Sequence, residues 1–374
     1  HLGDWGTQFG KLIYMIKNIK SASQTKNSRL RTTWPGDSLS GSLADLTIKD
    51  LVNLYVQFHK EVEADPSLED RAREEFRKLE DGDSENRKIW QFCIDVSMQE
   101  FGAIYEKLGI KFTENQGKGY GESFFEDKMQ PVIDELSDKK FLVTGDEGAK
   151  IVEFPENKYP VLMIIKKDGS TLYSTRDLAT DKFRLEKYGS QVVIINEVGT
   201  EQSLYFQQIY EVEKMLGWVK NGQRIHVKHG FFRFKDKKMS TRKGNVIWLT
   251  DVIDEAIKRA AKLSKDLKSQ KLSEQVAIGA LKWNELKRDS VKDIVFDWDE
   301  ILSMDGNSGP YVQYTYARCK SVIAKPKSGN DDCADTLYTE ERDLMVALGR
   351  FPEVIITVSK SYSPNLLCEY LFNL

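Results

Sequence analysis

The sequence predicts an α/β fold with a parallel, doubly wound sheet, preceded and followed along the chain by helical segments. Three observations lead to this prediction. Short β-like runs alternate with amphipathic helical runs between residues 161 and 229, an order typical of parallel sheets that bind ligands at the carboxyl ends of their strands. The hydrophobic period is helical over residues 37–109, and it is helical again after residue 250. With 374 residues, the chain is long enough for two or three domains.

The amino-terminal part is predicted to be mainly helical. A glycine-rich, aromatic stretch, "HLGDWGTQFG", leads into the short apolar-periodic run "KLIYMIKNI". Three stronger helix patterns follow, and they place residues 37–109 in a helical insertion. The patterns are "TIKDLVNLYVQFHKEVE", with an apolar stripe of Ile48, Leu51, Val52, Tyr55 and Val62, then the highly charged "SLEDRAREEFRKLEDG", and finally "NRKIWQFCIDVSMQEFGAIYEKLG", which ends at Gly109.

Strands and helices alternate in the middle of the chain. The predicted strands are "VLMII" at 161–165, "QVVIIN" at 191–196 and "RIHVKHG" at 224–230. Between them, "TLYSTRDLATDKFRLEKYG" changes from strand to helix near Ser174, and "TEQSLYFQQIYEVEKMLGW" predicts an amphipathic helix that ends at Gly217.

The last third is predicted to be helical. One helix starts at a Thr250 cap, "SEQVAIGALKWNEL" forms another, and "GPYVQYTYARCKSVIAK" begins a third with Pro310 in its first turn. The segment "PKSGNDDCAD", residues 326–335, is a predicted linker, and residues 336–374 are predicted to start an all-α domain.

Composition excludes several classes of protein. The formal net charge is −3, so the net charge of the chain does not indicate a nucleic-acid partner. It has no apolar run long enough for a membrane span and no signal segment. Local charge is less even, with six cations and no acid between Asp4 and Asp37. The four cysteines are far apart, which favours neither disulfides nor a thiolate zinc site and fits a reducing cytoplasm.

The segment "KKMSTRKGN", residues 237–245, concentrates cations, two hydroxyl groups and a glycine. Because it follows the strand at 224–230 and a short "FFRF" stretch, it would project from the strand ends, where ammonium and hydroxyl groups could meet phosphate oxygens. A solvated basic hairpin tip would have the same composition. Composition alone leaves both readings open.

The segment KMSTRKG resembles the second signature loop of the class I aminoacyl-tRNA synthetases, in the form seen in arginyl-tRNA synthetases. Four other segments resemble that family in family order: "HLGDWGTQFGKLI", "GESFF" at 121–125, "LYSTRDLAT" at 172–180 and "SGPYVQYTYARC" at 308–319. The resemblance covers essentially the whole chain. It implies a Rossmann-like (HUP) catalytic domain over residues 1–325 with 37–109 as its helical insertion, followed from residue 336 by the start of an all-α anticodon-binding domain.

The resemblance also implies a binding site for L-arginine. Asp177 and Glu122 would bind the guanidinium group, Tyr173 would line the pocket, and Gln202 would contact the amino-acid portion of the substrate. The residue types suit a delocalised cation, which needs carboxylates for forked hydrogen bonds and a π face. Ser174 and Asp177 also have the spacing of a capping box at the start of a helix, which is the alternative reading for Asp177.

The implied reaction is attack of the arginine carboxylate on the α-phosphate of ATP with loss of pyrophosphate, followed by acyl transfer to tRNA(Arg). Positioning and charge stabilisation dominate such a step, so Lys238 and Lys243, with the backbone of Ser240, are the catalytic candidates. Met239 and His229 would belong to the ATP site, although His229 could equally be an ordinary strand-end histidine. Mg²⁺ would be held mainly by the phosphates, and no editing domain is expected.

Two other patterns carry no site. His226 and His229 are three apart on a predicted strand, so their rings point to opposite faces and a shared metal is not expected. The stretch "GKGYGE" at 117–122 matches neither dinucleotide nor P-loop spacing.

The sequence departs from the class pattern in two ways. The HIGH-type signature is absent, and KMSK is replaced by Lys238-Met239-Ser240-Thr241, where a lysine upstream of HIGH is thought to compensate in this family. These departures lead us to expect a piece of a synthetase that is inactive on its own. We also expect the complete protein to be a monomer. Two alternatives stay open: a tRNA-independent nucleotidyltransferase of the HUP type, and a non-catalytic synthetase-derived module that binds RNA or protein.

Overall fold

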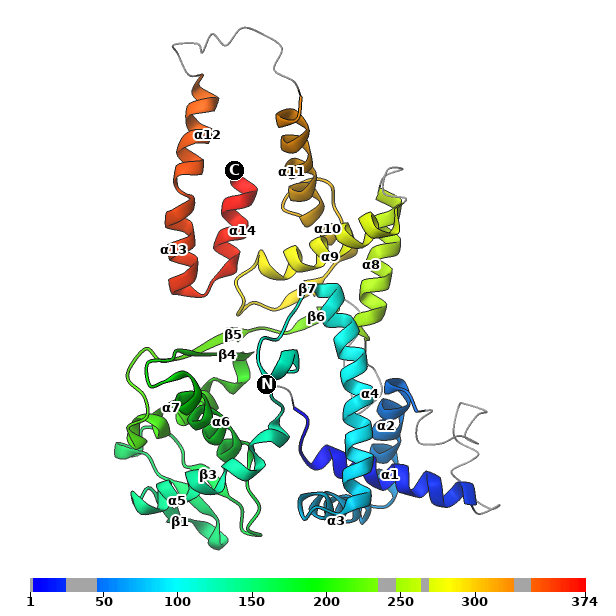
Figure 1. Cartoon of the computed structure of the whole chain (residues 1–374), viewed down its shortest axis with the longest axis vertical. Coiled ribbons are helices and arrows are strands. Elements are labelled where there is room, and N and C mark those ends of the chain that lie inside the picture. Colours follow the sequence, from blue (N-terminus) through cyan, green and yellow to red (C-terminus); the bar gives the residue numbers. More distant parts are fainter. Residues whose placement is uncertain (1–2, 25–45, 235–246, 264–268, 326–337) are drawn as a thin grey trace. The chain divides into compact units, whose positions relative to one another are not determined.

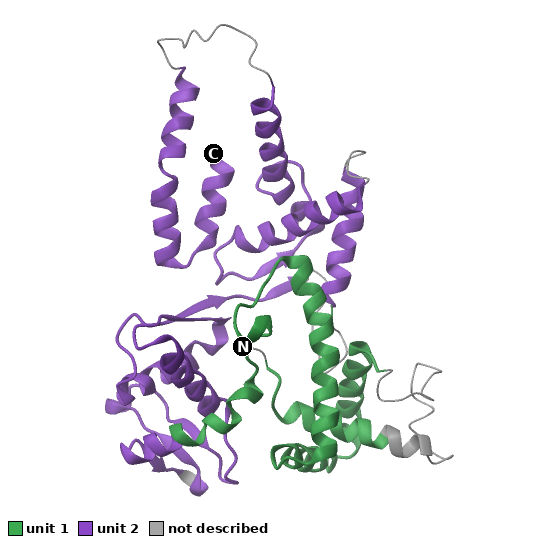
Figure 2. Cartoon of the chain, in the orientation of Figure 1, with its two compact units in different colours: residues 1–132, 239–247 green, residues 133–238, 248–374 purple. Residues whose placement is uncertain are grey.

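The computed structural model describes residues 3–24, 46–234, 247–263, 269–325 and 338–374. Of these, the residues up to 132 form one compact unit, and the residues from 133 to 234 and from 248 onward form a second (Figure 2). None of the helices within the described ranges is long and apolar enough to cross a membrane.

The first unit is a helical bundle (Figure 1). Its core contains Trp5, Ile13, Leu54 and Phe58, all at most 1% exposed, so the amino-terminal stretch packs with the predicted insertion. The predicted stripe on the second helix was partly wrong, because Leu54 and Phe58 are its most deeply buried apolar residues. The helices are α1 (Thr7–Gln24), α2 (Ile48–Ala64), α3 (Leu68–Glu80) and α4 (Ser84–Leu108), the last ending at Gly109 as predicted.

Two short 3₁₀ helices, Asn115–Gly117 and Glu122–Lys128, complete the first unit. Asp4 holds the second of them in place, because its carboxylate accepts hydrogen bonds from the Ser123 backbone N–H at 2.8 Å and from the Ser123 hydroxyl at 2.7 Å. Gly121 is required at this contact, since a Cβ atom there would lie 2.0 Å from Asp4 Oδ2. The segments "HLGDWG" and "GESFF" therefore lie against each other.

The second unit begins with a small antiparallel sheet that sequence reasoning did not foresee. Its strand order is β1-β2-β3, and the predicted strand at 161–165 pairs antiparallel with β2. The first two strands have only three residues each, which is too short for a clear hydrophobic period. The elements are α5 (Gln130–Asp138), β1 (Leu142–Thr144), β2 (Lys150–Val152) and β3 (Leu162–Ile165).

A parallel pair of strands follows, and α6 and α7 lie on the same side of it (Figure 1). The predicted strand at 191–196 begins and ends three residues later, because Ile194 is the first residue with a partner, Arg224, on the neighbouring strand. The helix α7 ends at Gly217 as predicted. The elements are α6 (Tyr173–Tyr188), β4 (Ile194–Gly199), α7 (Ser203–Leu216) and β5 (Arg224–His229).

The "FFRF" stretch forms a further strand, β6, which pairs in parallel with the unforeseen β7. Thr250 lies inside the next helix instead of capping it, because that helix begins one residue earlier. The elements are β6 (Phe232–Phe234), α8 (Leu249–Leu263), α9 (Gln270–Leu286), β7 (Ile294–Phe296) and α10 (Trp298–Ile301).

The chain ends in helices, as predicted. Pro310 lies in the first turn of α11, whose N-cap is Ser308. The predicted linker at 326–335 lies outside the described residues. A ring contact of 6.0 Å between Tyr311 and Phe372 joins the first of these helices to the last. The helices are α11 (Gly309–Ile323), α12 (Thr339–Gly349), α13 (Phe351–Ser361) and α14 (Pro364–Asn373).

Candidate functional site

The start of α6 is fastened to the strand β3. The hydroxyl groups of Ser174 and Thr175 donate hydrogen bonds to the carbonyl oxygens of Met163 and Ile164, at 2.5 and 2.6 Å. The helix begins at Tyr173 with Leu172 as its N-cap, and no side chain caps it. The capping-box reading of Ser174 and Asp177 is therefore wrong, because Ser174 lies inside the helix and its hydroxyl is committed to β3.

Asp177 lies in the second turn of α6 and is half-buried. Its Oδ2 atom accepts a hydrogen bond of 2.5 Å from the hydroxyl of Tyr205 on α7. Burial raises the pKa of Asp177 to about 6, and the Tyr205 hydrogen bond opposes that shift. Among the described residues, no cationic side chain forms an ion pair with Asp177. The carboxylate is thus held in place but not neutralised by the protein.

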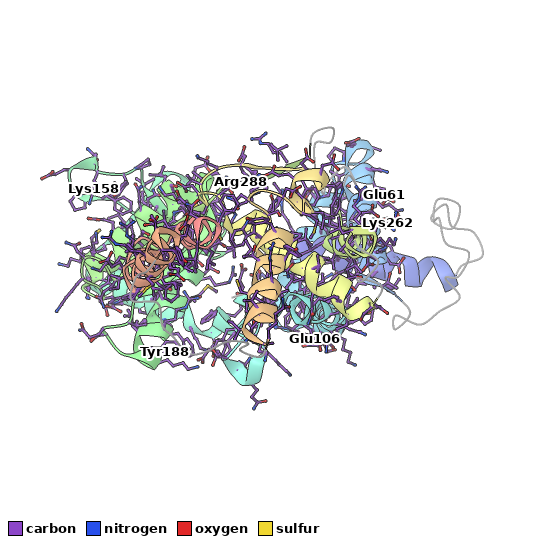
Figure 3. The ribbon with its side chains drawn as sticks, turned by 90° about the horizontal axis from the view of Figure 1, so that it is seen from above. Glu61, Glu106, Lys158, Tyr188, Lys262 and Arg288 are labelled. Atoms are coloured by element: carbon purple, nitrogen blue, oxygen red, sulfur yellow. The ribbon has the colours of Figure 1, made fainter. Side chains whose placement is uncertain are left out.

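Tyr173 lies one turn before Asp177 and presents its ring to solvent, with 59% of the residue exposed. The edge of the ring contacts Tyr205, with ring centroids 4.9 Å apart and an interplanar angle of 63°. Tyr205 therefore contacts both predicted site residues of α6. At the other end of the helix, Tyr188 is exposed at the periphery of the unit, as is Lys158 (Figure 3).

The next turn of α6 carries a different acid. Asp181 is 3% exposed and pairs with Arg184 at 2.7 Å and with Arg224 of β5 at 3.4 Å. Arg224 also donates from Nε to the fully buried Glu213 of α7 at 2.6 Å. Burial, with the adjacent Asp181 charge, holds the pKa of Glu213 well above its usual range. This cluster is a buried network of hydrogen bonds and ion pairs that ties α6, α7 and β5 together.

The carboxyl edge of the parallel pair lies next to the start of α7. Gly199 of β4 and His229 of β5 are partners in the last register position, and the Thr200 hydroxyl donates to the His229 carbonyl at 2.9 Å. His229 is exposed and its Nδ1 contacts the carboxylate of Glu197. Gln202 is exposed immediately before α7. Two predicted site residues therefore share this strand edge, where ligands of parallel sheets bind.

The remaining predicted residues lie elsewhere. Glu122 begins the 3₁₀ helix of the first unit, beside Ser123 and its partner Asp4. Lys238, Met239, Ser240 and Lys243 lie outside the described residues. The strand that leads to them, β6, is clamped by Asp293, which accepts hydrogen bonds from the Phe231 backbone at 2.8 Å and from Arg233 at 2.5 Å.

No group of three or more potential metal-ligating side chains is found within the part of the chain that the structure describes. The two strand histidines have separate partners, since His226 Nε2 contacts the Val198 carbonyl at 3.0 Å while His229 contacts Glu197.

Comparison with known proteins decides the family. The sequence family described as tRNA synthetases class I (R), catalytic domain, matches residues 1–298. The chain belongs to the arginyl-tRNA synthetase family. A second match, the DALR anticodon binding domain, covers residues 312–374. Helices α11 to α14 fall almost wholly within this second region.

Individual members of the arginyl-tRNA synthetase family agree with this assignment. The chain is 37% identical to the arginine–tRNA ligases of Fusobacterium nucleatum subsp. nucleatum and Clostridium perfringens, over 100% and 99% of its length. It spans 63% of the length of each of these relatives. The arginyl-tRNA synthetase structure from Plasmodium falciparum matches all of this chain and 60% of that chain, with a TM-score of 0.77 and 25% identity.

The likeness to the Thermus thermophilus arginyl-tRNA synthetase shows the same fold, with a TM-score of 0.75 at 21% identity, over 100% of this chain and 65% of that one. The predicted fold class, a class I synthetase catalytic domain followed by an all-α region, is thereby confirmed.

Sequence reasoning missed the residues that hold the two acids of α6, the predicted site residue Asp177 and the buried Asp181. Tyr205 lies 28 positions from Asp177, and Arg224 lies 43 positions after Asp181, so no local pattern joins either pair. A faint signal existed for Tyr205, because it follows Gln202 by three residues at the start of a predicted helix and would occupy its first turn.

Proposed function

We propose that this chain carries the arginine-recognising part of an arginine–tRNA ligase, which activates L-arginine with ATP and transfers it to tRNA(Arg). The observation that carries the proposal is Asp177, a half-buried carboxylate that is held by a tyrosine and forms no ion pair among the described residues, although the charges of Arg184 and Arg176 lower its pKa. A buried acid with a raised pKa is costly to ionise, and an external guanidinium would supply the missing charge. The family supports arginine as that cation.

The residues near Asp177 suit the rest of the substrate. In our proposal the carboxylates of Asp177 and Glu122 bind the guanidinium fork, and the exposed Tyr173 ring covers the delocalised cation. Gln202, at the strand edge, contacts the amino-acid portion. The substrate would thus extend from the first turn of α6 toward the start of α7.

The proposed chemistry has two balanced steps. The arginine carboxylate attacks the α-phosphate of ATP, and pyrophosphate leaves to give arginyl-adenylate. A ribose hydroxyl of tRNA then attacks the acyl carbon, and AMP leaves. This chain's own contribution is orientation of arginine, with Lys238, Lys243 and Ser240 proposed at the phosphates and Met239 and His229 at the adenosine. Mg²⁺ would accompany the phosphates.

We further propose that the α11–α14 region contacts tRNA, supported by its match to an anticodon-binding domain. The proposed division keeps the catalytic domain at residues 1–325 and the start of the all-α domain at 336–374. We also propose that the complete protein is a monomer and that it acts in the cytoplasm.

The test is calorimetric titration of L-arginine into the protein made from its complete open reading frame, together with arginine-dependent ATP–pyrophosphate exchange in the presence of tRNA. Asp177→Asn is expected to weaken arginine binding about 100-fold or more, because the guanidinium loses one of its two proposed charged partners. It should not lower the melting temperature, since the amide avoids the cost of ionising a half-buried acid.

The matched control is Glu186→Gln, which replaces an exposed acid on the same helix. The Glu186→Gln protein should bind arginine like the unsubstituted protein. Normal arginine affinity in Asp177→Asn would refute the assignment of the site. If the unsubstituted protein bound RNA but neither bound nor activated arginine, the non-catalytic module would be the better account.

A further inference from the structure

Tyr205 occupies the first turn of α7, three residues after Gln202. Its hydroxyl donates to Asp177 Oδ2 at 2.5 Å, and its ring contacts the rings of Tyr173 and Phe206, with centroids 4.9 and 5.2 Å away. Burial and the nearby Asp177 charge raise the pKa of Tyr205 well above its usual range, so the hydroxyl stays protonated and remains a donor.

The Tyr205 hydrogen bond restricts the carboxylate of Asp177. The terminal torsion of an aspartate is broad and roughly two-fold, so an unheld carboxylate samples many planes. A guanidinium fork requires one plane, because its N–H groups point in fixed directions. With Oδ2 bound to Tyr205, the carboxylate plane is set, and Oδ1 has no hydrogen-bonding partner among the described residues.

We propose that Tyr205 is a positioning residue for substrate recognition: its hydroxyl orients the Asp177 carboxylate for the guanidinium, and its ring supports that of Tyr173. The inference rests on the proposed function and extends it. Because Tyr205 and Gln202 share the start of α7, the same side chain also fixes the distance between the two ends of the arginine site. A loosely held site of this kind would lose affinity even with every contact residue present.

The Tyr205 hydroxyl also keeps Asp177 ionised near neutral pH. The hydrogen bond lowers the pKa of Asp177 against the effect of burial. Removal of the hydroxyl therefore raises that pKa further, and protonated Asp177 cannot pair with a guanidinium. The titratable and charged groups that face Asp177 are Tyr173, Arg176, Asp181 and Arg184 on α6 and Tyr205 and Tyr210 on α7.

The decisive variant is Tyr205→Phe, which keeps the ring and removes only the hydroxyl. Tyr210→Phe is the matched control, because Tyr210 lies on the same helix and donates to the neutral Asn196 side chain at 2.9 Å. L-Arginine is titrated calorimetrically into each full-length protein between about pH 6 and pH 8, with melting temperatures measured under the same conditions. The kcat and KM for arginine are measured in pyrophosphate exchange.

Tyr205→Phe is expected to weaken arginine binding roughly 10- to 100-fold, as for loss of a hydrogen bond to a charged group. The loss should be greater at pH 6 than at pH 8 and should fall on KM more than on kcat. Tyr210→Phe should stay within about twofold of the unsubstituted protein at each pH.

Three results would overturn the inference. An unchanged affinity and pH profile in Tyr205→Phe would show that the hydroxyl has no role in recognition. Equal losses in both variants, with equal falls in melting temperature, would show a purely structural role. Failure of the unsubstituted protein to bind arginine would refute the proposed function itself, and the inference with it. If the unsubstituted protein binds arginine but Tyr205→Phe shows none of the expected changes, the proposed function stands and only the inference about Tyr205 is refuted.

Discussion

Two successive turns of α6 each present an acid, Asp177 and then Asp181, and the two acids have different surroundings. Asp181 is buried and paired with Arg184 and Arg224. Asp177, one turn earlier, is half-buried and contacts only the neutral hydroxyl of Tyr205 among the described side chains. Both acids receive partners from more distant segments, yet only Asp181 receives a cation.

The difference distinguishes structural charge from binding charge. Two arginines form ion pairs with Asp181, whereas none does so with Asp177, although burial penalises the negative charge of Asp177. Asp177 instead receives a hydroxyl, which orients the carboxylate without neutralising it. Acids left in this condition are candidates for functional sites, because an external cation completes them.

Removing the Arg224 side chain from the buried network around Asp181 should have the largest effect on stability. In Arg224→Met, Asp181 and Glu213 lose the cation they share, so unfolding should require about 3–5 kcal/mol less free energy, measured by urea denaturation. The control is Lys214→Met, which removes a partly exposed ion-pair partner of Glu211 and should cost about 0–1 kcal/mol. Similar losses in the two variants would mean that the network around Asp181 is no more important than a surface pair.

The pH dependence of stability should sharpen the contrast at an intermediate size. The pKa of Glu213 is raised, so its contribution to stability is complete below its ordinary value of 4.5 and is lost as the pH rises toward the folded-state pKa. The unsubstituted protein should therefore lose roughly 1–2 kcal/mol between about pH 6 and pH 9, and Glu213→Gln should remove most of that slope.

Glu211→Gln on the same helix serves as the control for that measurement. Glu211 pairs with Lys158 near the surface at 2.9 Å, and its replacement should leave the slope unchanged. A Glu213→Gln protein with the same slope as the unsubstituted protein would place the titrating group elsewhere.

The smallest effect is expected at Tyr173, beside Asp177, and it should be seen in arginine binding. Tyr173→Leu removes the exposed ring beside Asp177, so arginine binding should weaken about 3- to 10-fold through loss of a cation–π contact. Tyr173→Phe keeps the ring and should bind within about twofold of the unsubstituted protein. Calorimetric titration of L-arginine measures both, and equal weakening in the two variants would point to the hydroxyl instead of the π face.

The helices and the two acids differ in how far the sequence could predict them. The hydrophobic period within long segments predicted α2, α3 and α4, and glycines predicted the ends of α4 and α7. Each of these signals lies within a single segment of the sequence. Three-residue strands such as β1 and β7 carry almost no period. Asp177 entered through family resemblance, whereas the pattern around it equally matched a capping box that the hydroxyl of Ser174 rules out.

Support for a site residue is harder to predict than the residue itself. Tyr205 and Arg224 act across gaps of tens of residues, and only packing of α6 against α7 and β5 brings them to their acids. The parallel register of β4 and β5 decides where Arg224 stands, and no local composition encodes that register.

The bond between Asp4 and Ser123 has a consequence for the order of folding. It closes a loop of 119 residues, and closing a loop of that length costs little more than closing a short one because the entropy grows only logarithmically. The intervening helices pack through contacts of smaller sequence separation, such as Lys11 with Glu69 across 58 residues, and contacts of smaller separation form earlier. Trp90 of α4 then donates to the Asp4 carbonyl at 2.8 Å and holds the amino-terminal segment against the bundle. We therefore expect the bundle to form before the turn that carries Glu122, so that its folding rate sets the moment at which that carboxylate becomes ordered.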